Sequence, residues 1–181
     1  MKRIAVIGPA GAGKSRLARR LADATGIEVI HLDALYWQPG WVPTPEAEWE
    51  ALQRRELERD SWIVEGLHET TVHLWLEAAD TVVLFDTSPL ASIWRVTRRR
   101  FVRSEPGPDV PAGCEPAPFH QAAAKFLAYL WEYRRRTRAD LFAELAKPLP
   151  GRRVLIVRRE RELQEFLRTV PASAGEALPA P

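Results

Sequence analysis

The sequence predicts an α/β fold in three layers, with a five-stranded, mostly parallel sheet covered by helices on both faces. Five short apolar runs, rich in β-branched residues, have the composition of buried parallel strands. Patterns with helical spacing lie between these runs along most of the chain. Alternating strands and helices of this kind build one parallel sheet, because each crossover returns a helix to one of its faces.

The expected strands and helices follow each other in a regular order. The strands are Arg3 to Ile7, Glu28 to His31, Trp62 to Glu65, Thr81 to Phe85 and Arg153 to Val157. Helices are expected after the first strand, from Thr44 to about Asp60, from Ser88 to about Arg103, from about His120 to Ala146 and from Glu160 to Thr169. Thr44-Pro45 and Ser88-Pro89 each supply a capping hydroxyl followed by proline at the first helical position, which sets where these two helices begin.

The length of 181 residues fits one domain, which we expect to span residues 1–170. Residues 104–119 are crowded with proline and glycine and lie between two long helices, a pattern typical of a functional lid. The last stretch, 171–181, has small residues and prolines and is expected to be a flexible tail.

Composition excludes some classes and leaves others open. Lys and Arg number 26 against 24 Asp and Glu, so the net charge is only +2, although a pI near 8.9 leaves nucleic-acid binding possible without favouring it. The single cysteine, Cys114, rules out an internal disulfide and a cysteine zinc cage. With neither a signal-peptide pattern nor a long apolar run, we expect a cytoplasmic protein without membrane contact, either a monomer or a homodimer.

The strongest functional signal is GPAGAGKS, from Gly8 to Ser15, which fits the phosphate-loop pattern at every required position. Glycines let successive backbone N–H groups face phosphate oxygens, Lys14 adds a charge for the β and γ phosphates, and Ser15 offers a hydroxyl to Mg²⁺. The loop stands between an apolar strand and a helical pattern, as a phosphate-loop NTPase requires. The expected nucleotide-binding residues are Gly8, Pro9, Ala10, Gly11, Ala12, Gly13, Lys14, Ser15 and Arg16.

Three carboxylates follow expected strands and therefore meet at the sheet edge where α/β proteins bind ligands. Glu65 is expected to hold Mg²⁺ together with Ser15, either directly or through water. Asp33 either binds the acceptor hydroxyl and takes its proton or shares the magnesium shell, and we favour the acceptor. Asp86 precedes Thr87-Ser88-Pro89 and is expected to be structural, capping the coming helix.

Arginines supply the positive charge that phosphoryl transfer needs. One cluster precedes the expected lid and another follows it: Arg95, Arg98, Arg99 and Arg100, then Arg134, Arg135, Arg136 and Arg138. We expect two or three of these to contact phosphate and single out Arg95, Arg99 and Arg135, because Arg95 and Arg99 share a helix face. Arg158, Arg159 and Arg161 are expected to form a plain exposed surface.

Aromatic residues surround Pro39-Gly40, just after Asp33. Trp37 and Trp41 either form a wall over the acceptor or pack into the core, and core packing is the commoner outcome. The four histidines lack metal-binding spacing, and we assign none of them a role.

Several of these motifs resemble known families. ADTVVLFDTSPLASIWRVTRRR resembles the adenylate-kinase-like segment in which two arginines contact the nucleotide, here Arg95 and Arg99. GPAGAGKS, HLDALYWQPGW, WIVEG, EAADTVVLFD and PDVPAGC together resemble the DNA topology modulation protein family, small relatives of these kinases. The resemblance covers roughly Met1 to Leu167 and implies the strand order 2-3-1-4-5, ATP as donor and an effect on DNA topology.

The sequence also departs from those families after the third strand. Members of the DNA topology modulation family usually show Asp-Gly-Asn-Tyr where this chain has Glu65-Gly66-Leu67-His68. Adenylate kinases place an arginine that grips the acceptor nucleotide where this chain has Glu69. Because an acid repels an acceptor phosphate, a nucleoside monophosphate is a poor candidate acceptor.

The first functional hypothesis is therefore an ATP- and Mg²⁺-dependent kinase that phosphorylates a small acceptor between Asp33 and the lid. The second is a nucleic-acid-associated ATPase or regulator that uses the arginine clusters, although no DNA-reading motif is recognisable. The absence of asparagine excludes the guanine-reading motif of GTPases and the catalytic loop of protein kinases. Chemistry like that of shikimate kinases is a nearer alternative, since Asp33 stands where those enzymes bind the acceptor, but the rest of their acceptor motif is missing.

Overall fold

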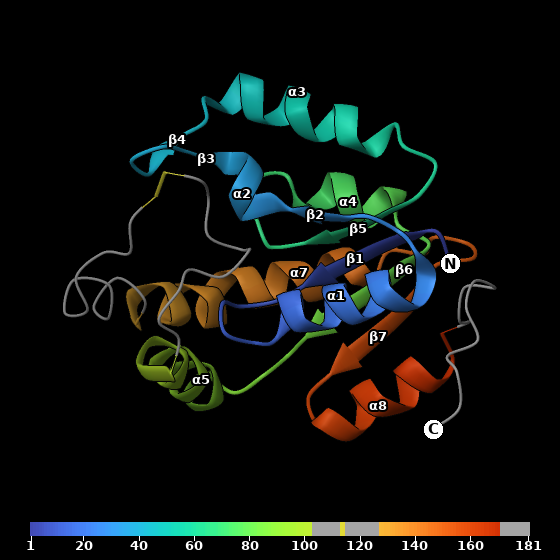
Figure 1. Ribbon diagram of the computed structural model, residues 1–181. Helices are drawn as coiled ribbons and strands as arrows, with labels where there is room; N and C mark the ends of the chain where they lie inside the picture. Colours follow the sequence, from blue (N-terminus) through green and yellow to red (C-terminus); the bar gives the residue numbers. More distant parts are fainter. Residues whose placement is uncertain (103–112, 115–126, 171–181) are drawn as a thin grey trace, which may run out of the picture.

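The computed structural model describes residues 1–102, 113–114 and 127–170, and its centre is a five-stranded parallel sheet (Figure 1). The strands are β1 (Arg3–Ile7), β2 (Val29–His31), β5 (Trp62–Glu65), β6 (Thr81–Phe85) and β7 (Arg153–Val157). They lie in the order β2-β5-β1-β6-β7, and every neighbouring pair is parallel. Counted along the chain this is the order 2-3-1-4-5, so the predicted fold class is confirmed.

Helices cover both faces of the sheet. Those with described bounds are α1 (Lys14–Thr25), α2 (Leu32–Tyr36), α3 (Glu46–Leu57), α4 (Val72–Ala78), α5 (Pro89–Val102), α7 (Arg138–Leu145) and α8 (Glu160–Arg168). Residues 127–132 are also helical and continue through a π-helical turn, η1 (Tyr133–Thr137), into α7. Within the described residues, no helix combines the length and the apolar character that crossing a bilayer demands.

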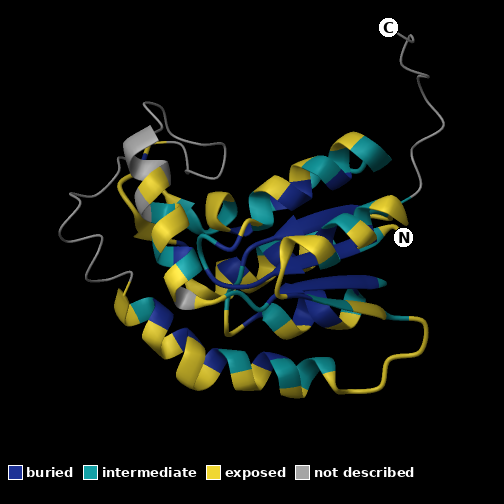
Figure 2. Cartoon of the chain, turned by 90° about the horizontal axis from the view of Figure 1, so that it is seen from below, coloured by how far each residue is buried: buried dark blue, intermediate teal, exposed yellow. Residues whose placement is uncertain are grey.

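Two hydrophobic cores result, one on each face of the sheet. On one face, α1 and α8 contribute Leu17, Leu21 and Phe166. On the other face, α3, α4 and α7 contribute Trp49, Trp75 and Leu141. The strands β5, β1 and β6 at the centre of the sheet are buried, the edge strands β2 and β7 are partly exposed, and the outward faces of the helices are exposed (Figure 2).

Element bounds agree with the sequence prediction to within a few residues. The second strand begins at Val29 instead of Glu28, and α3 ends at Leu57 instead of about Asp60. The helix expected from His120 is described only from residue 127, because 115–126 lie outside the described residues. The expected lid at 104–119 also lies outside them, except for Gly113 and Cys114, as does the expected tail.

The prediction that Thr44 caps a helix is wrong. Its hydroxyl donates a 2.6 Å hydrogen bond to the Tyr36 carbonyl, and its backbone N–H donates to the same oxygen. Pro45 takes the N-cap position of α3 instead. The Thr44 hydroxyl is bonded to Tyr36 because this contact closes a small antiparallel hairpin made of β3 (Trp37–Gln38) and β4 (Val42–Pro43). The sequence analysis did not recognise this hairpin.

The loop between β1 and α1 is held by close backbone contacts. Gly8 adopts φ 141°, and a Cβ atom there would lie 2.7 Å from the Phe85 carbonyl oxygen at the end of β6. Gly11 adopts φ 76°, and its Cβ would lie 2.8 Å from the Ser92 carbonyl oxygen of α5. Only glycine fits both the backbone angle and the space at these two positions.

We expect Gly8→Ala to lower the free energy of unfolding by about 3 kcal/mol, because the methyl group overpacks the Phe85 backbone. Gly26→Ala is the matched control, since Gly26 also has a positive φ, 72°, but no described atom lies within 4 Å of its Cβ position. That control should cost only about 1 kcal/mol, the strain of a left-handed residue. Urea unfolding measures both values, and equal losses would contradict the close approach at Gly8.

Candidate phosphate-binding site

The phosphate loop lies where the sequence predicts it, between the end of β1 and the start of α1. Gly8, Gly11 and Gly13 all adopt positive φ, which turns the backbone around a concavity. The Lys14 ammonium group donates a 3.1 Å hydrogen bond to the Pro9 carbonyl, so its side chain folds back over the loop. Ser15 and Arg16 follow in the first turn of α1, which presents its N-terminus to the same concavity.

Arg95 extends from α5 to the same loop. Its Nη1 donates a 3.2 Å hydrogen bond to the Ala12 carbonyl. A cavity of about 180 Å³ opens beside this contact, between the loop, α1 and the start of α8. Most of the polar side chains that line it are cationic: Arg16, Arg20, Arg95, Arg158 and Arg159. The structure thus joins Arg95 to the phosphate loop, and its contact with phosphate stays a prediction.

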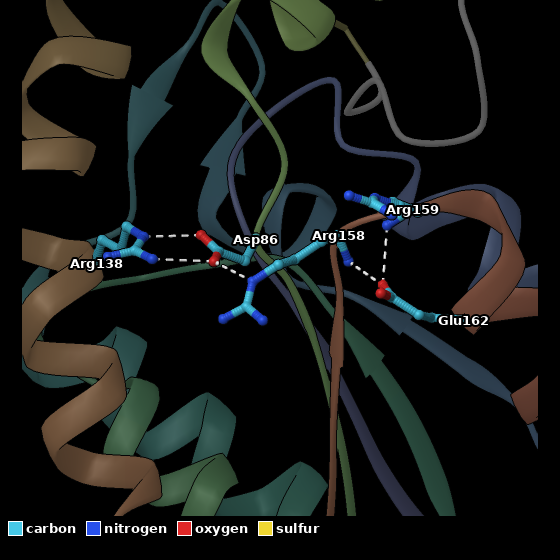
Figure 3. A network of polar contacts seen from close by, with 5 residues as sticks. All are labelled: Asp86, Arg138, Arg158, Arg159 and Glu162. Atoms are coloured by element: carbon cyan, nitrogen blue, oxygen red, sulfur yellow. Dashed lines mark hydrogen bonds and ion pairs between the residues drawn. The ribbon is translucent and has the colours of Figure 1, made fainter.

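Arg158 and Arg159 are exposed, as the sequence predicts, but both also line this cavity. They are positioned by Glu162, whose carboxylate accepts hydrogen bonds from both backbone N–H groups, at 2.6 and 2.9 Å (Figure 3). Arg161, by contrast, faces solvent and pairs with Glu165. Arg158 and Arg159 could have been recognised as site candidates from the sequence, because they come directly after β7, at the carboxyl edge of the sheet.

Asp86, directly after β6, is the centre of an ion-pair network (Figure 3). Nε and Nη2 of Arg138 donate to its two carboxylate oxygens at 2.7 and 3.0 Å, and Nε of Arg158 donates to Oδ2 at 3.2 Å. The hydrogen bonds from Arg138, helped by Arg158, hold the pKa of Asp86 below its usual value despite partial burial. Asp86 is structural, as expected, but its carboxylate ties β6 to α7 instead of capping α5.

Buried Glu65 and half-buried His31 form a pair at the adjoining strand ends. Glu65 is 6% exposed, and its Oε1 lies 2.7 Å from Nδ1 of His31 on β2. Glu65 is also in register with Val6 on β1, two residues before the phosphate loop. Glu65 therefore lies at the end of the strand next to β1, while its binding of magnesium stays a prediction. The sequence analysis gave the histidine beside it no role.

Asp33 and Tyr129 also belong to the surroundings of the loop. Asp33 is exposed in the first turn of α2. The Tyr129 hydroxyl, from the helix before η1, accepts a hydrogen bond from the backbone N–H of Ala10. Burial, and after it the charges of Asp33 and Glu69, raises the pKa of Tyr129 to about 12. Tyr129 was missed from the sequence because nothing local links it to a loop more than a hundred residues away.

The other arginines that were singled out or clustered with them differ in their surroundings. Arg135 is exposed, and its guanidinium lies 5.8 Å from the centre of the Trp131 ring. Arg136 pairs with Glu132, and Arg138 with Asp86. Arg99 belongs to α5, but its side chain lies outside the described residues. Contact of Arg99 or Arg135 with phosphate therefore stays a prediction.

Aromatic side chains gather beyond Asp33. Tyr36 packs against Trp37 and His68, with ring centres 4.8 and 4.0 Å apart, and Trp41 packs against Trp37 at 5.7 Å. The hairpin that carries the two tryptophans contacts the described part of the expected lid. Gly40 N–H donates to the Gly113 carbonyl at 3.0 Å, and the Cys114 thiol donates to the Gln38 carbonyl at 3.3 Å.

Comparison with protein-family models and with curated proteins gave no match. Among solved structures, the chain is similar to a gluconokinase from Sinorhizobium meliloti 1021, with a TM-score of 0.52 and 20% identity, over 92% of this chain and 87% of that one. It also matches a sugar kinase from Janibacter sp. HTCC2649, with a TM-score of 0.47 and 18% identity, over 93% of each chain. The first likeness agrees with the sheet order and the loop in assigning a phosphate-loop NTPase fold.

We expect Asp86→Asn to lower the free energy of unfolding at neutral pH by about 2 kcal/mol, because Arg138 and Arg158 lose their shared partner. A carboxylate with a depressed pKa stabilises the fold above its unfolded-state pKa of about 4, and this contribution disappears as the pH falls through the folded-state value. Urea unfolding at several pH values should therefore show the two proteins converging below about pH 4. Asp23→Asn, an exposed position on α1, is the control, and an Asp86→Asn profile parallel to wild type would contradict the network's role.

Proposed function

We propose that the protein is an ATP- and Mg²⁺-dependent phosphotransferase that acts on a small molecule carrying a hydroxyl group. The observation that supports it most is the arrangement around the phosphate loop. Lys14 and Arg95 bond to the loop itself, while Glu65 ends the neighbouring strand. A concavity of N–H groups with cations at its rim and a carboxylate beside it is what a magnesium-bound polyphosphate requires.

The residues present fit a magnesium ion. Ser15 offers a hydroxyl and Glu65 a buried carboxylate, and oxygen ligands with one or two carboxylates suit Mg²⁺. We propose that these two residues hold the ion, with His31 orienting the Glu65 carboxylate through its 2.7 Å contact. Bound there, magnesium neutralises charge on the phosphates.

The chain's own residues have distinct proposed roles. Lys14 and Arg95, with Arg99 and Arg135, stabilise negative charge on the transferred group, and the cationic cavity beside Arg95 accommodates the rest of the nucleotide. Asp33 binds the acceptor hydroxyl and takes its proton. The loop residues Gly8 to Arg16 bind the phosphates of ATP.

Membership of the DNA topology modulation family is part of the proposal, and it raises a second function, a nucleic-acid-associated ATPase. One observation favours it: Arg134 and Arg135 are exposed on neighbouring positions of η1. We rank it second because Arg136 and Arg138 of the same helical stretch are engaged in ion pairs. DNA affinity that falls steeply with salt and is lost on changing Arg134 and Arg135 would reverse this order.

The test is ADP release by the purified protein from ATP and Mg²⁺, with a panel of nucleosides, sugars and polyols. At least one acceptor should accelerate it, and Lys14→Ala should lower that rate about 100-fold or more, because a cation at the transferred phosphate is removed. Lys147→Ala is the matched control, since Lys147 is exposed and, in the part of the chain that the structure describes, its ammonium group pairs with Glu144. Lack of any Lys14-dependent consumption of ATP would refute the proposed function.

A further inference from the structure

A second cavity, of about 230 Å³, lies between the end of β6, the start of α5 and the helical turn η1. The side chains that line it are Asp86, Thr87, Ser88, Tyr133, Arg134 and Arg138. No phosphate-loop residue is among these described lining residues, although Thr87 also borders the cavity beside Arg95. Because each lining side chain carries a polar or charged group, the cavity suits a small polar ligand and not an apolar one.

Tyr133 is the lining residue whose hydrogen bonding is incomplete. Its side chain is only 3% exposed, and its hydroxyl is enclosed without a hydrogen-bond partner. A buried polar group without a partner costs free energy, so native proteins usually supply one. Burial raises the pKa of Tyr133, and the hydroxyl therefore keeps its proton at physiological pH. The partner that completes such a donor is an acceptor atom.

Positive charge exceeds negative charge around this cavity. Arg138 donates to both carboxylate oxygens of Asp86, and Arg158 donates to Oδ2, so two guanidinium groups share one carboxylate (Figure 3). Arg134 is exposed and adds a further cation, for which the described residues supply neither an ion pair nor a hydrogen bond. An anion in the cavity would therefore meet a net positive charge.

The first turn of α5 adds backbone donors at the same place. Ser88 lines the cavity and precedes Pro89, and the Ser92 N–H donates to the Ser88 carbonyl at 3.1 Å, which closes the first turn. The N–H groups of Leu90 and Ala91 come before that bond, so the helix offers them no carbonyl. With 14 residues, α5 also has a helix dipole whose positive end favours an anion.

The π-helical turn explains why side chains of η1 gather on the cavity. The Arg138 N–H donates to the carbonyl of Tyr133, five residues earlier. A hydrogen bond over five residues brings Tyr133 and Arg138 closer to one helix face than an α-helical turn would. Arg134, from the same turn, lines the cavity with them. Such turns occur frequently at functional sites.

We propose that this cavity binds a tetrahedral oxyanion, either inorganic phosphate or the phosphate group of a small metabolite, at a site separate from the phosphate loop. Arg134 and the first turn of α5 provide the positive charge, and the Tyr133 hydroxyl donates its proton in a hydrogen bond to one anion oxygen. The inference does not depend on the proposed function, since none of the lining residues belongs to the phosphate loop.

Calorimetry with inorganic phosphate, glycerol 3-phosphate and ribose 5-phosphate, in the absence of ATP, tests the site. At least one of them should bind, and Arg134→Gln should weaken that binding about 10-fold or more, because a charged hydrogen-bond donor is lost. Lys14→Ala should leave this Arg134-dependent binding in place. Arg136→Gln is the matched control, since Arg136 lies in the same turn but pairs with Glu132. Binding of inorganic phosphate assigns the free ion, and binding of the esters alone assigns a metabolite.

Tyr133→Phe separates ligand binding from a structural role. It should weaken binding of the same compound about 5-fold. In phosphate-free buffer the urea midpoint should not fall, because the hydroxyl has no partner to lose. A variant that unfolds at lower urea and binds the compound as wild type does would contradict the role of this hydroxyl.

A crystal soaked with tungstate, a heavy tetrahedral oxyanion, locates the site directly. The heavy atom should lie in the cavity beside Arg134 and the first turn of α5. Tungstate only on the phosphate loop would overturn the inference. Equal affinity in wild type and Arg134→Gln, binding that is lost in Lys14→Ala, or no binding of any of the three compounds would overturn it too.

Discussion

The close approach of the phosphate loop to its neighbours is the constraint on which the rest of the site depends. At Gly8 the loop runs against the backbone at the end of β6, and at Gly11 against the backbone of α5. A side chain at either position would push the loop away from the sheet. Because the loop is fixed in this way, α1 points its N-terminus into the concavity and Arg95 can reach the Ala12 carbonyl.

The charged residues at the carboxyl edge of the parallel sheet differ between its two halves. β6 and β7 end next to the cationic side, where Asp86 is shared by Arg138 and Arg158. β2 and β5 end next to the acidic side, where Glu65 pairs with His31. The loop lies after β1, between these two pairs of strands.

The sequence predicted the parts of the molecule that depend on neighbouring residues. The five strands, the phosphate loop and the start of α5 at Pro89 follow from local composition, and the structure agrees with each of them. Arg95 could also be placed, since helical spacing relates it to the residues before it. Thr44 shows the limit of such reasoning, because a capping pattern was outweighed by a hairpin contact with Tyr36.

The contacts that could not be predicted join residues far apart in the chain. Asp86 and Arg138 are 52 positions apart, Glu69 and Thr137 are 68, and His31 and Glu65 are 34. Each depends on how helices return to the sheet, which local patterns do not encode. The π-helical turn is a further example, since it contains Thr137, the residue that donates to Glu69, and no composition signal marks it.

The most direct test of the account is a crystal structure with Mg²⁺ and a non-hydrolysable ATP analogue. The account predicts that the β and γ phosphates lie on the backbone N–H groups between Gly8 and Ser15. It also predicts that the Lys14 ammonium group leaves the Pro9 carbonyl to contact phosphate. A nucleotide bound elsewhere, or a loop that keeps the Lys14 to Pro9 contact with no phosphate on its amides, would contradict it.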